Sequence, residues 1–497
     1  MKPDPHPAKP QEVELKLYLP SADPAGLAQR LAHIPLLRRR KPSRQVLHNI
    51  YYDTPDQRLR QQRAVLRLRR VGNDAQPQWL QTFKTGARDN SALSRRGEWE
   101  SPVDAPTLSR QALESTPWAD LDPDGRLFAV LKPCFVTVFE RTAWLVRRRD
   151  GSVVEVALDL GHIEANGQRT PICELELELK AGTTAALFAM AQEITLSVAV
   201  LPASMSKAER GFLLAQDGLN QPHHGDLPAL SAKLPVQLLA QQVLRNMLSQ
   251  FTRNLDSLRV SDDPEVVHQA RIGWRRFKSG LRFFNKVLPL AAPPASEALR
   301  HLLTSLGELR NLDVACTETL PALASAYAMG YTRRAQSWHT LTQALVQASA
   351  LQRQRVRHTL QQPDVGASLL AITHWLETLP ASESMALTRK ASWRHWAKHR
   401  ILRLQQQLQH VQDAAHTPEQ WHRVRILAKR LRYNSEALHS LLPRRLARRC
   451  TDQATKLQTS LGAARDITQA SVLLDKLELD HGIVEFLRGV AVGAEQA

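Results

Sequence analysis

The sequence predicts an α+β protein of two domains, an antiparallel β domain followed by an all-α domain. Up to residue 217, short runs alternate apolar and charged residues and are separated by turn signals such as Asn166-Gly167. After residue 235, long segments are rich in Leu, Ala, Gln and Arg and poor in glycine, as is typical of helices. The intervening stretch holds Gly, Pro, Asn and Asp without a period, which indicates a linker. We therefore expect domains at 11–217 and 232–490, joined by a linker at 218–231.

The 497 residues carry a net charge of +18 that is unevenly distributed. Residues 1–225 hold 30 Lys and Arg against 26 Asp and Glu, whereas residues 226–497 hold 36 against 22. The second half, at +14, therefore predicts a polyanionic partner. No apolar run reaches the roughly 18 residues of a membrane helix, and the N-terminus lacks the apolar segment of a secretory signal. Four widely spaced cysteines fit a reducing compartment, so we expect a cytoplasmic protein without membrane contact.

The elements of the β domain follow from the alternating runs, each of which predicts one strand. Helices are expected at Pro24–Ala32 and Thr183–Ile194. The predicted strands are Glu12–Leu19, Ala64–Arg70, Gln78–Lys84, Val136–Arg148, Val153–Leu160 and Ile172–Leu179.

Several of these strands carry their charges on a single face. Glu12, Glu14 and Lys16 share one face of the first strand, and Arg67 and Arg69 share one face of another. Such faces are commonly solvated, but strands of one sign are poorly suited to a surface because neighbouring like charges repel. Turned inward in a closed barrel, they would line a polar tunnel. Its carboxylates would bind a divalent cation and its arginines would bind phosphates, which is the equipment of phosphoryl transfer.

At these residues the sequence resembles the CYTH family, the triphosphate tunnel metalloenzymes. EVELK at Glu12–Lys16 opens the match, which continues through VLRLRR, the ER pair at Glu140-Arg141, ALDLG, ICELELELK and SKAERGFLLA. The resemblance implies an eight-stranded antiparallel tunnel with flanking helices that hydrolyses triphosphates with Mg²⁺ or Mn²⁺. Which late-strand glutamate is a ligand stays open, and Asp159 is a further candidate.

The resemblance also implies roles for individual residues of the tunnel. It makes Glu12, Glu14 and Lys16 catalytic. The implied metal ligands are Glu12, Glu14, Glu174, Glu176 and Glu178. The implied triphosphate-binding residues are Lys16, Arg67, Arg69, Lys84, Arg141, Lys207 and Arg210.

The helical half contains two copies of one pattern. VHQARIGWRRFKSGLRFF begins at Val267 and WHRVRILAKRLRYNSEAL at Trp421, and each is followed by an SLG motif, SLGELRNLDV or SLGAARDITQ. Two copies predict a bundle of two pseudo-symmetric halves. In each copy, His and basic residues step by three and four along one helix face. A solvated basic face would explain one such helix, but its repetition favours an anion site.

These two stretches resemble the CHAD domain, a helical domain found next to CYTH domains. The family implies binding of inorganic polyphosphate, with no catalysis in this half. Binding should strengthen as pH falls through the histidine range near 6.5. Nucleic acid is an unlikely ligand because aromatic residues make up 5% and none is interleaved with the basic stripes. The implied polyphosphate-binding residues are His268, Arg271, Arg275, Arg276, Lys278, His422, Arg425, Lys429, Arg430 and Arg432.

Together these observations predict a metal-dependent enzyme that hydrolyses inorganic triphosphate, with a basic helical domain that binds inorganic polyphosphate. One alternative is a CYTH enzyme directed at nucleotides or thiamine triphosphate, either an adenylate cyclase or a thiamine triphosphatase. A second alternative is a non-catalytic module that binds polyphosphate or nucleic acid.

Overall fold

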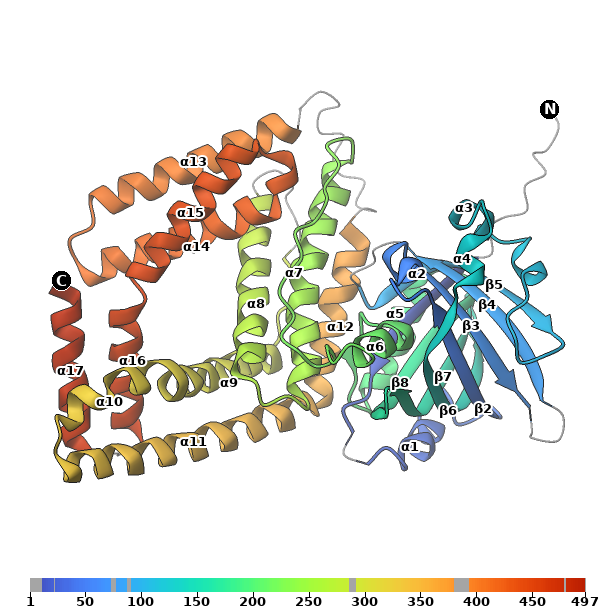
Figure 1. Cartoon of the computed structure of the whole chain (residues 1–497), viewed down its shortest axis with the longest axis horizontal. Helices are drawn as coiled ribbons and strands as arrows, with labels where there is room; N and C mark the ends of the chain where they lie inside the picture. The colour runs from blue at the N-terminus through green and yellow to red at the C-terminus, as the bar shows by residue number, and fades with distance from the viewer. Residues whose placement is uncertain are drawn as a thin grey trace. The chain divides into compact units, whose positions relative to one another are not determined.

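The computed structural model describes residues 11–21, 23–72, 77–86, 91–285, 292–379, 393–477 and 480–496. The chain divides into two compact units (Figure 1). The first contains residues 1–221 together with 360–374, and the second contains residues 222–359 together with 375–497. The predicted class, an antiparallel β domain followed by a helical region, is confirmed.

Eight antiparallel strands of the first unit close into a barrel. Their order is β5-β4-β3-β2-β6-β7-β8-β1, and β1 also pairs with β5, which closes the ring. The short β9 (Leu201–Pro202) pairs with the end of β1, at Leu17 and Tyr18. The barrel strands are β1 (Gln11–Tyr18), β2 (Ser43–Asp53), β3 (Ala64–Val71), β4 (Gln78–Gly86), β5 (Leu93–Val103), β6 (Lys132–Arg147), β7 (Val153–Ala165) and β8 (Gln168–Ala181).

Two of the main apolar cores of this unit lie outside the barrel. Leu15 and Leu17 of β1 pack with Leu177 of β8 beneath helices α1 (Leu27–His33) and α5 (Thr184–Thr195). The second outer core lies around Trp118 of α3 (Trp118–Leu121). A third cluster lies on the inner side of the strands, where α6 (Lys207–Leu214) packs against residues such as Phe139, which also lines the cavity. Two further short helices are α2 (Arg58–Gln61) and α4 (Arg126–Ala129). Because alternate residues of a strand point to opposite faces, these outward cores direct the charged residues inward.

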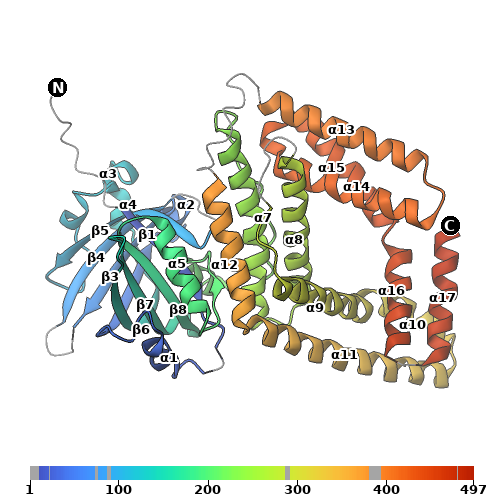
Figure 2. The ribbon, with the colours of Figure 1, turned by 180° about the vertical axis from the view of Figure 1, so that it is seen from behind.

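The first unit includes a helix that is remote in sequence, because residues 360–374 cover most of α12 (Pro363–Thr378). Leu370 is fully buried in the same core as α5. His374 stacks on Phe188 of α5 with ring centroids 4.5 Å apart, and both views show α5 and α12 side by side (Figure 2). A Cβ on Gly366 would lie 1.8 Å from the carbonyl oxygen of Val200, so this close approach requires glycine.

The second unit is helical. The repeated helices α8 and α14 begin alike, each with a side-chain cap followed by proline: Asp263 caps α8 and Thr417 caps α14. They contact each other, and Asn434 donates a hydrogen bond to Ser279 Oγ at 3.2 Å. The helices are α7 (Val236–Leu258), α8 (Pro264–Phe284), α9 (Glu297–Val314), a π-helical turn (Ala315–Thr319), α10 (Leu320–Ala328), α11 (Thr332–Leu360), α13 (Trp393–Asp413), α14 (Pro418–Ala437), α15 (Arg444–Ser460), α16 (Ala463–Lys476) and α17 (His481–Gln496).

The two copies of the SLG motif differ in local structure. Gly307 of the first copy lies inside the continuous helix α9, whereas Gly462 of the second lies at the break between α15 and α16. Within the described ranges, every helix is too short or too polar to cross a lipid bilayer.

The position of Leu370 predicts that α12 contributes to the stability of the first unit. Leu370→Ala should lower the free energy of unfolding of the barrel by about 2–5 kcal/mol, because it leaves a cavity in the core under α5. Hydrogen exchange of the β1 and β8 amides in the full chain measures this. Leu351→Ala is the control, since the Leu351 side chain is 56% exposed and its truncation should change stability by less than about 0.5 kcal/mol. Equal effects of the two substitutions would contradict the packing of α12 on this core.

Candidate functional site: a charged tunnel and a basic helical pocket

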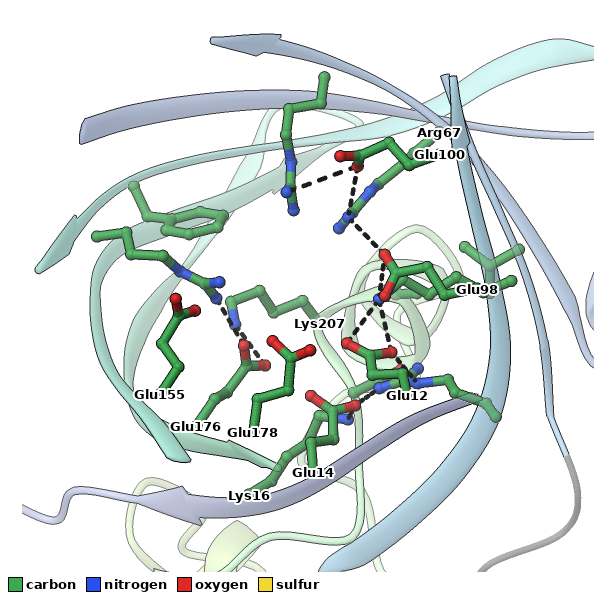
Figure 3. Close-up of a pocket in the computed structure, with 18 of the residues that line it drawn as sticks. Glu12, Glu14, Lys16, Arg67, Glu98, Glu100, Glu155, Glu176, Glu178 and Lys207 are labelled. Carbon is green, nitrogen blue, oxygen red and sulfur yellow. Dashed lines mark hydrogen bonds and ion pairs between the residues drawn. The ribbon is translucent and has the colours of Figure 1, made fainter. Parts of the chain in front are cut away.

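The barrel encloses a cavity of about 280 Å³ whose walls are densely charged (Figure 3). Glu155, Glu176 and Glu178 point into it from β7 and β8, while Glu98 and Arg67 approach from other strands. It brings together ten of the twelve tunnel residues that the sequence predicts. They are Glu12, Glu14, Lys16, Arg67, Arg69, Lys84, Arg141, Glu176, Glu178 and Lys207. The other two, Glu174 and Arg210, lie just behind the lining and pair with each other at 3.4 Å.

Lys207, at the start of α6, is the centre of one charge cluster. Its Nζ lies 2.7 Å from Asp159 and 3.0 Å from Glu176, and it also pairs with Glu174. Asp159 and Glu174 are directly opposite in the pairing of β7 with β8. Arg141 adds a two-bond contact to Asp159, with both distances 2.7 Å.

The same three acids form the carboxylate group best suited to a metal among the described residues. Asp159, Glu174 and Glu176 each offer one oxygen, and these atoms lie within 4.8 Å of one another. A set of carboxylate oxygens fits a hard divalent cation such as Mg²⁺ or Mn²⁺. Of the three glutamates on the late strand, Glu174 and Glu176 belong to this set and Glu178 does not.

A second charge cluster lies on β1 and its neighbour β5. Glu12 pairs with Lys84 at 2.9 Å and with Arg96 at 3.1 Å. Glu14 pairs with Lys16 at 2.5 Å and also with Arg96. The inward charges of the first strand are therefore neutralised by cations from three strands.

Sequence reasoning missed some of the lining. Arg96, Glu98, Glu100 and Glu155 line the cavity, but the sequence analysis assigns them no role. Their signal was present, since VVEVALDL and SRRGEWE alternate as the other strands do. Glu155 lies opposite Glu178, which lies opposite Glu14, so three carboxylates cross three adjacent strands in one row.

The helical unit contains a separate pocket of about 600 Å³ between the two repeated helices. It brings together five of the ten predicted residues: His268, Arg275, Arg425, Lys429 and Arg432. The polar lining also includes residues to which the sequence assigned no role. They are Arg310, Glu318, Thr319, Tyr433, Thr455, Gln458, Thr459 and Asp466.

The other five predicted residues of this half lie outside the pocket lining. Arg276 is 3% exposed and donates to Gln250 at 2.7 Å, whereas Lys278 is exposed. Arg271 contacts the carbonyl oxygen of Leu303 at 3.4 Å. The remaining two are His422, which lies 2.8 Å from Arg465, and Arg430, which is close enough to Arg282 and Arg400 to interact electrostatically with them.

Comparison with protein-family models matches residues 10–212 to the CYTH domain and residues 242–475 to the CHAD domain. The chain joins a CYTH domain to a CHAD domain. Residues 360–374, which pack in the first unit, thus lie within the CHAD match.

Three known proteins illustrate these similarities. A protein of Haemophilus influenzae named inorganic triphosphatase is 35% identical over 205 residues, which cover 41% of this chain and 55% of that protein. The chain thus spans about half the length of this curated relative. The CHAD domain crystal structure from the plant Ricinus communis has 25% identity and a TM-score of 0.47, covering 56% of this chain and 92% of that one. A Hippeastrum protein, described as a putative adenylyl cyclase with a dominant triphosphatase activity, has 19% identity and a TM-score of 0.32. The match covers 43% of this chain and 100% of that one.

Two acids of the CYTH tunnel have a lowered pKa despite their burial. Burial alone would raise the pKa of Glu176, but Lys207, Arg141 and Lys16 hold it well below its usual range. Burial would likewise raise the pKa of Glu12, and Lys84 with Arg96 holds it well below its usual range. The carboxylate row behaves differently, because burial raises the pKa of Glu178, and Glu12 and Glu155 raise it further.

The CHAD pocket has the opposite electrostatic character, with an excess of cations. Burial, followed by repulsion from Arg275 and Arg425, lowers the pKa of Lys429 to about 7. Burial and Arg310 lower the pKa of His268 to about 3, and burial also lowers the pKa of His422. In the free protein, Lys429 therefore titrates near neutral pH. The sequence analysis expected the two histidines, rather than a lysine, to titrate in this range.

The contacts of Lys207 predict a large structural effect of its removal. Lys207→Met should lower the free energy of unfolding of the barrel by about 3–5 kcal/mol, because three buried carboxylates lose a common partner. Urea unfolding of the full chain, followed by hydrogen exchange in β7 and β8, measures the loss. Lys180→Met is the matched control: Lys180 pairs with Glu178, but its side chain is 41% exposed, so about 1 kcal/mol or less is expected. Losses of similar size in both variants would contradict this account of the cluster.

Proposed function

We propose that the CYTH tunnel hydrolyses inorganic triphosphate with the help of Mg²⁺ or Mn²⁺, and that the CHAD pocket binds inorganic polyphosphate. One observation carries the proposal: a single cavity inside the barrel is lined by both clustered carboxylates and a set of inward arginines and lysines. Phosphoryl transfer needs metal ligands beside cations that hold phosphate oxygens. The Haemophilus influenzae relative, named inorganic triphosphatase, supports the same activity.

Each tunnel cation has a place in this reaction. Arg67 lies 3.5 Å from Glu98, and Arg69 lies 3.9 Å from Glu100, at distances that leave donors available for phosphate oxygens. The planar guanidinium group can bind two oxygens at once, which fixes the orientation of the triphosphate. Lys16 and Lys84 would bind its other end from β1 and β4, with Arg141 and Lys207 on the remaining wall and Arg210 behind it, paired with Glu174. These cations hold the terminal phosphorus in line with an attacking water.

The acidic residues supply the metal ligands in this proposal. Glu174, Glu176 and Asp159 form the compact oxygen set, and Glu12, Glu14 and Glu178 reach the same cavity from β1 and β8. When bound, the cation neutralises phosphate oxygens and lowers the pKa of a coordinated water. The residues of this chain bind the substrate, orient it and exclude bulk water.

The shape and lining of the cavity favour inorganic triphosphate over a nucleotide. Its volume of about 280 Å³ is below the ~300–1,000 Å³ typical of pockets for drug-sized ligands. Both aromatic rings of the lining are already engaged. The Lys207 ammonium lies 5.1 Å from the ring centre of Phe139, and Tyr51 stacks on Phe135 with ring centroids 4.5 Å apart. A base would therefore find little surface on which to stack.

The CHAD pocket is suited to a linear polyanion. Its cations come from α8, α9 and α14, so one ligand can contact several helices at once. Its 600 Å³ also leaves room for more than one phosphate group. We further propose a cytoplasmic location, which the four free cysteines support.

The first functional prediction concerns Glu14. Glu14→Gln should lower metal-dependent release of phosphate from triphosphate by about 100-fold or more, since metal-ion stabilisation of a transition state is worth several kcal/mol. Glu164→Gln is the control, because Glu164 pairs with Arg169 away from the cavity lining. Unchanged metal-dependent turnover in Glu14→Gln would exclude this tunnel as the active site.

The second functional prediction concerns the binding of polyphosphate by the CHAD pocket. Arg425→Glu should weaken binding of long-chain polyphosphate by the full chain at least tenfold, or about 1.4 kcal/mol. Arg448→Glu on α15 makes the same charge change at a side chain that is 86% exposed, and should have a small effect. Equal weakening would mean that net charge, rather than the pocket, controls binding.

Polyphosphate binding should also depend on pH through Lys429. With a pKa of about 7, Lys429 is charged below that pH and loses its charge above it. Affinity should therefore fall as pH rises through 7. Lys429→Arg should remove this dependence, because arginine stays charged. A pH dependence that persists in Lys429→Arg would assign it to another group.

A further inference from the structure

Glu318 enters the cationic CHAD pocket from an unusual backbone segment. It lies in the π-helical turn Ala315–Thr319 that follows α9, and it lines the pocket. Its carboxylate accepts a hydrogen bond from Arg310 Nη2 at 2.8 Å. π-Helical turns are rare and are frequent at functional sites. An acidic side chain is therefore already paired with Arg310, one of the cations that a phosphate ligand would need.

The surroundings of Glu318 explain why an internal anion is favourable there. The charged groups of the described lining are one histidine, five basic residues and two acids. The basic residues repel one another: burial lowers the pKa of Lys429, and the nearby Arg275 and Arg425 lower it further. Glu318 and Asp466 are close enough to interact. Burial raises the pKa of Asp466, and the charge of Glu318 raises it further. Glu318 thus relieves part of the excess positive charge when no ligand is bound.

We propose that Glu318 is a built-in competitor of the ligand, whose carboxylate holds Arg310 until a phosphate group displaces it. This inference rests on the proposed polyphosphate-binding function of the pocket. The Glu318 side chain is 55% exposed, whereas that of Arg310 is 15% exposed. The glutamate can therefore move into solvent while the arginine stays in the pocket. A pair with one exposed partner is weak, so a polyanion held by several other cations can replace it.

The test compares two substitutions that remove the same charge. Glu318→Gln frees Arg310. Glu308→Gln is the matched control, since Glu308 is exposed on α9 and accepts from Gln352 at 3.1 Å outside the pocket lining. The probe is sodium polyphosphate of one fixed long chain length, titrated into the full chain at low ionic strength. Glu318→Gln should tighten the Kd by about threefold to fivefold, and Glu308→Gln should leave it nearly unchanged.

A double-mutant cycle isolates the contact. In an Arg310→Gln background, the further substitution Glu318→Gln should no longer tighten binding, because its competitor role acts through Arg310. Circular dichroism of each variant checks that the helices are intact.

The possible outcomes separate this inference from the function on which it rests. Equal tightening in Glu318→Gln and Glu308→Gln would reduce the effect to net charge and overturn the inference. Weaker binding by Glu318→Gln would mean that Glu318 orients Arg310 for the ligand, which also overturns it. In both cases the polyphosphate function survives. If the wild-type chain and Glu318→Gln both fail to bind polyphosphate, the proposed function fails and the inference fails with it. Binding by Glu318→Gln alone supports the inference.

Discussion

The CYTH domain depends on the mutual neutralisation of charges inside its barrel. Two of its apolar cores lie outside, between the strands and helices such as α5 and α3, so every second residue of several strands carries polar groups inward. An unpaired buried carboxylate would cost several kcal/mol. Lys207 avoids this cost for three acids at once, and Arg96 does so for Glu12 and Glu14. The closed barrel, the outer helices and the ion pairs therefore depend on one another.

The same pairing explains how a neutralised tunnel could accept the highly charged substrate that we propose for it. A triphosphate with a divalent cation brings both signs of charge into the cavity, so each side chain can exchange an internal partner for one of the opposite sign. The groups are already oriented, which is the basis of electrostatic preorganisation. The CHAD pocket differs because its cations outnumber its acids among the residues described there. An imbalance of this kind favours retention of a polyanion, whereas the balanced tunnel favours turnover.

The sequence predicted the inward charges well because strand parity is visible in a single sequence. EVELK and VLRLR have period two, and their charged residues do line the cavity. It could not predict the partners, because the register that places Asp159 opposite Glu174 depends on pairing between distant strands. In the helical half, the three-and-four spacing identified one face, but packing decides how much of it reaches the pocket. Arg275 lines the pocket, while its neighbour Arg276 is buried against Gln250. The pattern of residues 363–374 does not indicate that this helix packs in the first unit while its neighbours in sequence pack in the second. An apolar helix face predicts that the face is buried, but not which partner covers it.

The most direct test of this account is substrate preference measured on one preparation of the full chain. Phosphate release should be compared for inorganic triphosphate, ATP and thiamine triphosphate, each with Mg²⁺, with Mn²⁺ and with a chelator in excess. The account predicts that inorganic triphosphate has the highest kcat/KM, and that the chelator abolishes turnover. A higher kcat/KM for ATP or thiamine triphosphate, or full turnover in the presence of the chelator, would contradict it.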